Sequence, residues 1–321
     1  MSELSKSVVA KMTKERVKER MQNRELELKA RADPKRGMEN LSNHVTTGYA
    51  ASKGPGRRMQ SALGFEYTQE QAGRHAQFMK GYMPQLTRRS MRWAESFPNL
   101  KNLAGKYSPD GEAEMCHSAK LKRFIRKGIP NNLRPHVWMS ISGAGANLLA
   151  KPGYYNKLVH SGNRDYADQI SLDIPRTFPN NIHFKSEKDN QQQLHRVLLA
   201  YANHNPKVGY CQGMNFVAGM LLLVLEGNEE QTFWLFDAMI AKLPPKLYDE
   251  TMIGIQIETA TLAEIIKTNF EDVAKILKAR CCLEVLPVIS VKWFINAFVD
   301  TVPEETVLRI WDVLFYEDWK V

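Results

Sequence analysis

Apolar residues recur every three or four positions through most of the chain beyond about residue 65, and this periodicity most constrains the fold. Leu194, Val197, Leu198 and Tyr201, for example, would line one face of a single helix. No segment of useful length alternates apolar and polar residues as a half-buried strand does. We therefore predict an all-α body of many irregularly packed helices, over residues 85–97, 133–149, 190–203, 213–226, 230–243, 257–279, 284–299 and 304–316.

The net charge of +9 is concentrated in the first 60 residues. That segment holds 14 Lys and Arg against 7 Asp and Glu, whereas residues 61–321 hold 30 against 28. A nucleic-acid footprint should lie on the folded domain as a basic face. Because the body is nearly neutral, we predict no nucleic-acid partner.

The basic N-terminal extension has two open interpretations. Residues 1–31 carry a thin apolar stripe at helical spacing, with Val9, Met12, Val17 and Met21. They form either a solvated marginal helix or disordered chain, or else a helix that docks on an acidic partner or an anionic membrane. Residues 33–58 contain Gly-Pro-Gly with Ser, Thr and Asn, a composition typical of a linker.

Cysteine usage and hydropathy point to a cytoplasmic protein. The N-terminus lacks the apolar stretch of a signal peptide. The longest apolar run, residues 216–225, falls short of the ~20 residues that span a bilayer. No CxxC or zinc spacing occurs, so we expect reduced thiols at Cys116, Cys211, Cys281 and Cys282.

Known enzyme motifs such as the P-loop, HExxH and GxSxG are not found, but two polar turns stand out between apolar segments. In the first turn, residues 170–179, Pro175 and Pro179 flank Arg176. Pro175 should keep Ile174 out of the helical region, giving a stiff loop that projects the arginine towards a partner's phosphates. The alternative is a plain connector whose arginine pairs with Asp173.

The second turn, residues 208–215, leads into an apolar helix that begins near Met214. It places Tyr210, Gln212 and Asn215 beside a helix start, which is a natural anion-facing end. The alternative is a helix cap with a hydrogen-bonded tyrosine.

A third segment, residues 126–138, contains Arg134 and Trp138 in an RxxxW pattern. The order RxxxW, IxxDxxR (residues 170–176) and YxQG (residues 210–213) resembles the TBC domain of Rab GTPase-activating proteins. The resemblance covers residues 121–321 and implies the irregular all-α TBC fold. We accordingly predict a basic, partly disordered tail and linker over residues 1–60, a helical extension over 61–120 and the TBC domain over 121–321.

This resemblance implies an activator of a Rab-family GTPase rather than an enzyme with its own cofactor, since the partner binds the GTP and the magnesium ion. Arg176 would be the arginine finger, and Gln212 would position the attacking water. Asp173 would brace the finger loop, and Tyr210 would contact the partner or hold the glutamine turn. Arg134 and Trp138, one helical turn apart, would form a structural clamp.

One alternative function is a non-catalytic Rab-binding or scaffolding protein, and another is a membrane or nucleic-acid binding role carried by the basic tail. A location at the periphery of endomembranes would suit the basic residues 1–60. Family domains usually continue past Trp311-Asp312, so the domain is expected to be truncated. Its last helix should then expose one apolar side, which would include Val307, Leu308, Ile310, Trp311, Leu314 and Phe315.

Overall fold

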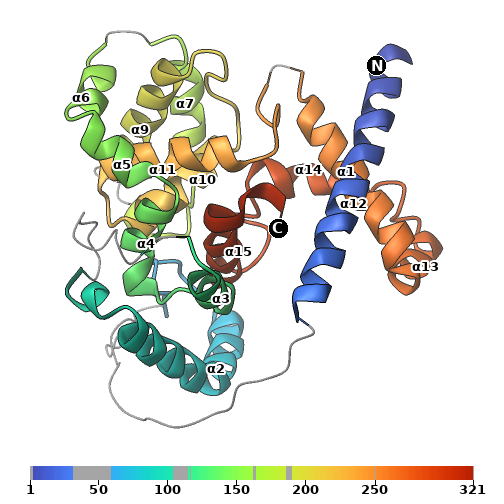
Figure 1. Cartoon of the computed structure of the whole chain (residues 1–321). Coiled ribbons are helices and arrows are strands. Elements are labelled where there is room, and N and C mark those ends of the chain that lie inside the picture. Colours follow the sequence, from blue (N-terminus) through green and yellow to red (C-terminus); the bar gives the residue numbers. More distant parts are fainter. Residues whose placement is uncertain are drawn as a thin grey trace. The chain divides into compact units, whose positions relative to one another are not determined.

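The computed structural model describes residues 3–31, 59–103, 115, 117–161, 164–185, 190–249 and 251–320 (Figure 1). Helices dominate these ranges, and the β-pairing within them is limited to isolated bridges between Gln60 and Glu66 and between Phe65 and Asn181. The all-α prediction is confirmed. The chain divides into two compact units, and α15 contributes to both.

The larger unit holds most of the helices and all of the predicted site residues. Its elements are α2 (Gln69–Ser96), η1 (Pro98–Leu103), α3 (Ala119–Lys127), η3 (Asn131–Leu133), α4 (Arg134–Ile141), α5 (Ala144–Ala150), α6 (Tyr154–Val159), α7 (Ala167–Asp173), η4 (Ile174–Arg176), α8 (Ile182–Lys185), α9 (Asn190–His204), α10 (Met214–Val224), α11 (Glu229–Lys242) and the last part of α15 (Glu304–Glu317).

Helices α9 and α10 form the core of the larger unit. Almost every residue of α10 is buried, as expected for a helix that is apolar on all sides. The face of α9 that the sequence predicts to be apolar is buried as well, and α9 packs against α6, α7, α10 and η4. Both candidate turns are therefore anchored to the most buried helices of the unit.

Two predicted helices of this unit have different bounds in the structure. Residues 133–149 form two helices, because Gly143 adopts a left-handed conformation (φ +80°) between α4 and α5. The predicted helix 85–97 is the end of the longer α2, which starts at a capping box between Thr68 and Gln71 and continues through Pro84. Pro84 therefore lies inside the helix rather than at its start.

The smaller unit contains α1 (Glu3–Arg31), α12 (Ile253–Asn269), α13 (Glu271–Ala279), α14 (Leu286–Ile295), the start of α15 and η5 (Asp318–Lys320). Residues 257–279, predicted as one helix, are two, because the backbone of Phe270 leaves the helical conformation (φ −133°, ψ 60°). Helix α12 packs against α1, α13 and α14.

Helix α1 packs on α12 rather than standing free in solvent. The carboxylate of Glu258, which is fully buried, accepts Arg20 Nη2 at 2.6 Å and lies 3.4 Å from Arg16 Nε. Arg16 also lies 4.0 Å from the centre of the Trp319 ring. The acidic group that α1 meets therefore belongs to its own unit, and the linker 33–58 lies outside the described residues.

The expectation of an exposed last helix is wrong. Five of the six apolar residues named for it are buried, the exception being the partly exposed Ile310. Trp138 supplies part of the cover, since its ring lies 5.0 Å from that of Phe315 and 6.1 Å from that of Trp311. The sequence reasoning missed this because it considered only later residues of the chain as cover for the helix, whereas α4 precedes it by about 170 positions.

Candidate functional site

Arg176 ends the short 3₁₀ turn η4, directly after α7. Ile170, Asp173 and Ile174 face the interior, whereas the side chain of Arg176 is 54% exposed. Contrary to the prediction, Ile174 is helical (φ −57°, ψ −51°). The α region is disfavoured before proline but not forbidden, and here Pro175 opens a tight turn that Thr177 N closes by donating to Ile174 O at 3.0 Å.

Gln212 lies on the turn between α9 and α10, which we call the glutamine loop (residues 205–213). Two glycines with positive φ shape this loop, Gly209 at +61° and Gly213 at +107°. A side chain at Gly209 would also collide with the Tyr166 hydroxyl. Gln212 is exposed, whereas the residues on either side of it are partly or fully buried.

Asp173 joins this loop to the arginine loop (residues 174–179). Its buried carboxylate accepts two hydrogen bonds. Oδ1 accepts one from Arg176 Nη2, and Oδ2 accepts one from the Tyr210 hydroxyl at 2.5 Å. One carboxylate therefore contacts both Arg176 and the tyrosine that lies two residues before Gln212. Arg176 and Gln212 are thus both exposed, and one buried carboxylate links the two loops that carry them.

A second bridge, which the sequence reasoning did not include, joins the same loops. Asn215 Nδ2 donates to Thr177 Oγ1 at 2.7 Å, and Asn215 Oδ1 accepts Gly213 N at 3.0 Å. Thr177 Oγ1 in turn donates to Asp173 O at 2.9 Å. Both side chains are buried, so these bonds hold the loops without competition from water. The signal available in the sequence was a polar residue within the first turn of an otherwise apolar helix.

Burial favours the neutral forms of two side chains of the glutamine loop, Tyr210 and Cys211. Burial, and then the hydrogen bond to Asp173, raises the pKa of Tyr210 well above its ordinary value, so the tyrosine remains a neutral donor. Burial also raises the pKa of the Cys211 thiol, which disfavours the nucleophilic thiolate. The two exposed side chains above them, Arg176 and Gln212, carry a guanidinium group and an amide group.

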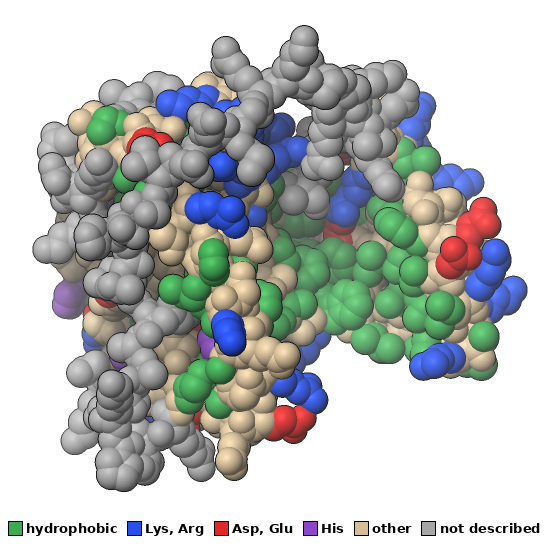
Figure 2. Space-filling model, turned by 90° about the horizontal axis from the view of Figure 1, so that it is seen from below, with side chains coloured by type: hydrophobic (Ala, Val, Ile, Leu, Met, Phe, Trp, Pro, Cys, Tyr) green, Lys and Arg blue, Asp and Glu red, His purple; other side chains and the backbone are tan. Residues whose placement is uncertain are grey.

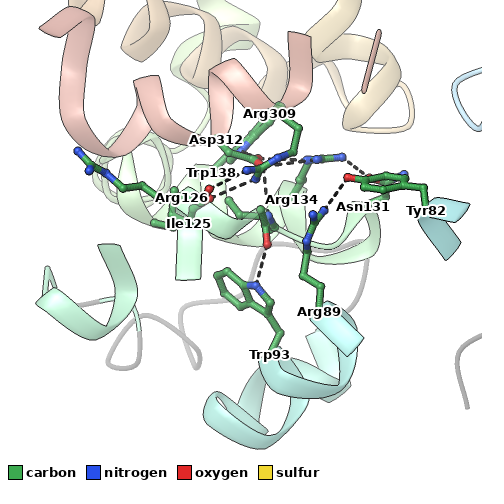
Figure 3. A network of polar contacts seen from close by, with 12 residues as sticks. Tyr82, Arg89, Trp93, Ile125, Arg126, Asn131, Arg134, Trp138, Arg309 and Asp312 are labelled. Carbon is green, nitrogen blue, oxygen red and sulfur yellow. Dashed lines mark hydrogen bonds and ion pairs between the residues drawn. The ribbon is translucent and has the colours of Figure 1, made fainter. Parts of the chain in front are cut away.

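Arg134 and Trp138 lie in the core between α4 and α15, and both meet Asp312 (Figure 3). Arg134 Nε and Trp138 Nε1 donate to Asp312 Oδ1 at 3.1 and 3.0 Å, and Arg134 Nη1 also donates to Asn131. On the other oxygen, Asp312 Oδ2 accepts Arg309 Nη1 at 3.2 Å and the Ile129 amide at 3.1 Å. The structure thus places this pair in a buried polar network rather than beside the exposed Arg176 and Gln212.

Asp312 is the residue of this network to which the sequence reasoning gave no role. The usable signal was its position on α15, because a carboxylate four residues after Leu308 and three before Phe315 falls on the buried face. A buried charge requires a partner of opposite charge, and here there are two arginines.

The described ranges contain neither a candidate metal site nor a candidate membrane-spanning helix. They contain no group of three or more His, Cys, Asp or Glu side chains that could hold a metal ion. Within the same ranges, no helix is both long enough and apolar enough to cross a membrane.

The chain is similar to proteins of one family. The family profile described as Rab-GTPase-TBC domain matches residues 131–321. Growth hormone-regulated TBC protein 1-A of Danio rerio is 41% identical over 250 residues, which are 77% of this chain and 66% of that protein. Its Homo sapiens counterpart is 40% identical over 250 residues, covering 77% of this chain and 70% of that protein. The GTPase-activating protein MSB4 of Saccharomyces cerevisiae is 32% identical over 264 residues, with coverage of 72% and 53%. The chain thus spans about two thirds of the first two relatives.

Solved structures agree. The Chlamydomonas flagellar RabGAP TBC domain superposes with a TM-score of 0.64 at 28% identity, covering 81% of this chain and 82% of the other. The Ypt/Rab-GAP domain of Gyp1p superposes with a TM-score of 0.54 at 20% identity, covering 70% and 79%, which speaks for the fold alone. From the matched profile and these relatives, the chain belongs to the Rab-GTPase-TBC domain family.

Proposed function

We propose that this chain accelerates GTP hydrolysis by a Rab-family GTPase and supplies Arg176 and Gln212 in trans. The observation that carries the proposal is the shared support of the two residues. Arg176 and Gln212 are exposed on adjacent loops, while Asp173, Tyr210, Thr177 and Asn215 beneath them are buried and hydrogen-bonded. Two side chains that are exposed to solvent and held in place by buried residues are suited to act on a group that another protein binds.

Arg176 would stabilise the charge that spreads over the phosphoryl oxygens in the transition state. An arginine supplied in trans increases the rate of GTP hydrolysis by roughly 10³–10⁵ in small GTPases. Its planar fork of donors can bridge two oxygens, which an ammonium group cannot do. Asp173 would hold the guanidinium while no partner is bound and orient it from behind when one arrives.

Gln212 would position the attacking water. Its amide can accept a hydrogen bond from the water and donate one to a phosphoryl oxygen at the same time. The positive φ at Gly209 and Gly213 and the bond from Tyr210 to Asp173 would fix where that amide points. GTP and magnesium would come with the partner, so the chain would need no cofactor of its own.

The first test measures single-turnover GTP hydrolysis by a panel of purified Rab proteins. We expect Arg176→Ala to lose most of the acceleration while Rab binding is retained, and Arg176→Lys to recover little. Arg88, an exposed arginine on α2, provides the matched control, and Arg88→Ala should behave like wild type. A non-catalytic binding protein would instead bind a Rab with no acceleration even as wild type.

The second test separates Gln212 from the partner's own glutamine. A Rab whose catalytic glutamine is replaced by alanine should still be stimulated by the wild-type chain, but not by Gln212→Ala. If the wild-type chain stimulates normal Rab and fails on this mutant, Gln212 does not position the water. Arg176 would then act alone.

A further inference from the structure

The most exposed large hydrophobic side chain in the described part of the molecule is Leu172, with 76% of its surface accessible. The residue lies near the end of α7, four positions before Arg176. Its neighbours Ile170, Asp173 and Ile174 take the buried side of this segment. Leu172 therefore contributes little to the core, and a polar residue would serve the fold equally well at this position.

A single exposed leucine is common on protein surfaces, so exposure alone gives it no function. The position of Leu172 distinguishes it. Leu172 and Arg176 are separated by the junction of α7 with the 3₁₀ turn η4, and four helical residues advance roughly 6–8 Å along the axis, so Leu172 lies about one helical turn from Arg176. Pro175, also exposed, lies between them in sequence. The support under Arg176 also fixes the end of α7, so the leucine is presented on a rigid element.

Any protein that brings a phosphate to Arg176 must cover this part of the surface. A specific interface buries on the order of 800 Å² on each partner, a patch roughly 30 Å across. A side chain about one helical turn from Arg176 therefore lies well inside such a patch, where water is excluded. Apolar groups at the centre of an interface favour binding when they meet an apolar surface.

We infer that Leu172 is a docking residue for the GTP-loaded GTPase partner, where it packs against an apolar surface next to the partner's phosphate-binding end. This inference rests on the proposed function. A leucine makes no contact with the reacting atoms, so it should contribute to binding in the ground state and the transition state equally. Removing it should raise the partner concentration for half-maximal stimulation and leave the maximal rate unchanged. GTPases with a polar surface at the facing position should be poorer partners, which makes Leu172 a determinant of partner choice.

The test is a titration of a responsive Rab with Leu172 variants, read as KM and kcat separately. Leu172→Ala should raise KM on the order of tenfold, as expected for losing one buried leucine. Leu172→Asp should raise it further, because the carboxylate would be buried without a partner. Leu172→Met, which keeps an apolar side chain of similar volume, should stay close to wild type.

Phe78 provides the matched control, since it is 58% exposed and lies on α2, which Figure 1 shows at the opposite end of the larger unit from α7. Phe78→Asp should leave KM unchanged, and thermal melting should show all variants equally folded. Unchanged KM in Leu172→Asp, or a fall in kcat at constant KM, would overturn the docking role. If the wild-type chain stimulates no Rab in the panel, the proposed function itself fails.

Discussion

Asp173 links the two loops that carry the proposed fingers, because one of its oxygens is bound by Arg176 and the other by Tyr210. Arg176 occupies one oxygen and Tyr210 the other, and the side chain is buried. A buried carboxylate is costly unless it is paired, so the contacts with Arg176 and Tyr210 stabilise the fold as well as the site. Fold stability and finger geometry are therefore coupled through this one residue.

Removing the Tyr210 hydroxyl should separate these two contributions. We expect Tyr210→Phe to reduce the free energy of unfolding by about 1–2 kcal/mol, because one buried acceptor oxygen of Asp173 loses its donor. The maximal rate of stimulated GTP hydrolysis should fall several-fold, since the glutamine loop loses a fixed point. Tyr155→Phe is the control. Tyr155 is equally buried, and its hydroxyl donates to Glu229 on α11 at 2.6 Å, outside both loops, so its loss should leave the maximal rate unchanged. Equal rate losses in the two variants would contradict the role given to Tyr210.

The Tyr210→Phe variant should also change how stability depends on pH. Burial and Asp173 raise the pKa of Tyr210 above its ordinary value of 10.0. The folded state therefore holds this proton more tightly than the unfolded state, and its contribution to stability is complete below about pH 10 and lost as the pH rises further. Denaturant unfolding at about pH 8 and about pH 11 should show a smaller alkaline loss in Tyr210→Phe than in wild type.

At the scale of single residues, the exposed candidate residues could be predicted from the sequence more readily than the buried residues that hold them. Motif order was enough to single out Arg176 and Gln212. Thr177 was not found, because a buried hydroxyl that bridges two loops leaves no trace in spacing or periodicity. The conformation of Ile174 was predicted wrongly, because the local preference before proline is weaker than the tertiary packing that holds this turn.

Among the elements, α4 and α15 depend on one another through the network around Asp312. Trp138 is fully buried, donates to Asp312 and packs on Phe315, while Arg134 supplies the opposite charge. The helices that carry these residues are about 170 positions apart in sequence, with Trp138 and Asp312 separated by 174. This network therefore joins two parts of the larger unit that are far apart in sequence.

We expect Trp138→Ala to lower the free energy of unfolding by roughly 3–5 kcal/mol, the range for losing a buried aromatic side chain. Trp138→Phe keeps most of the apolar volume and loses the bond to Asp312, so its loss should be smaller, on the order of 1 kcal/mol plus the reduced packing. Chemical denaturation of both variants measures the difference. If Trp138→Ala unfolds like wild type, the clamp contributes nothing to the larger unit.

Element positions were predicted best where periodicity ran undisturbed. The predicted 190–203, 230–243 and 304–316 correspond closely to α9, α11 and α15. Long predicted helices broke where one backbone left the helical region, at Gly143 and at Phe270. The glycine is a clear signal, whereas the break at Phe270 has only the weaker signal of two acids, Glu271 and Asp272, in the first turn of the next helix. Short helices such as α6 and α7 were missed because six or seven residues are too few to show a period.

For the whole molecule, the largest difference from the sequence prediction concerns where apolar surface is exposed. The last helix is covered, but the smaller unit exposes hydrophobic side chains on α13, on α14 and at their ends (Figure 2). The exposed fractions range from 44% to 75% for Phe270, Val273, Ile276, Val285, Val288 and Ile289. Monomeric proteins seldom leave so many neighbouring apolar side chains in water.

The charges beside these residues favour a second copy of the chain as the cover. Helix α13 begins with Glu271 and Asp272 and carries Lys275 and Lys278 towards its end. Two copies of α13 side by side in antiparallel orientation would bring acidic ends against basic ends, and the helix dipoles would agree. An anionic lipid surface would instead suit a face with an excess of positive charge.

We therefore expect self-association that increases with protein concentration and is weakened by Ile276→Ser combined with Val288→Ser. Both side chains are more than half exposed, so polar replacements should leave the fold intact while removing apolar area from the contact. Sedimentation velocity over a wide concentration range measures the effect. Phe78→Ser combined with Leu149→Ser, which alters two exposed apolar residues of the larger unit, is the matched control and should associate like wild type. A constant monomer mass for the wild-type chain would show that the exposed face of α13 and α14 does not pair with itself. Equal weakening by both double variants would assign the association to general surface hydrophobicity instead.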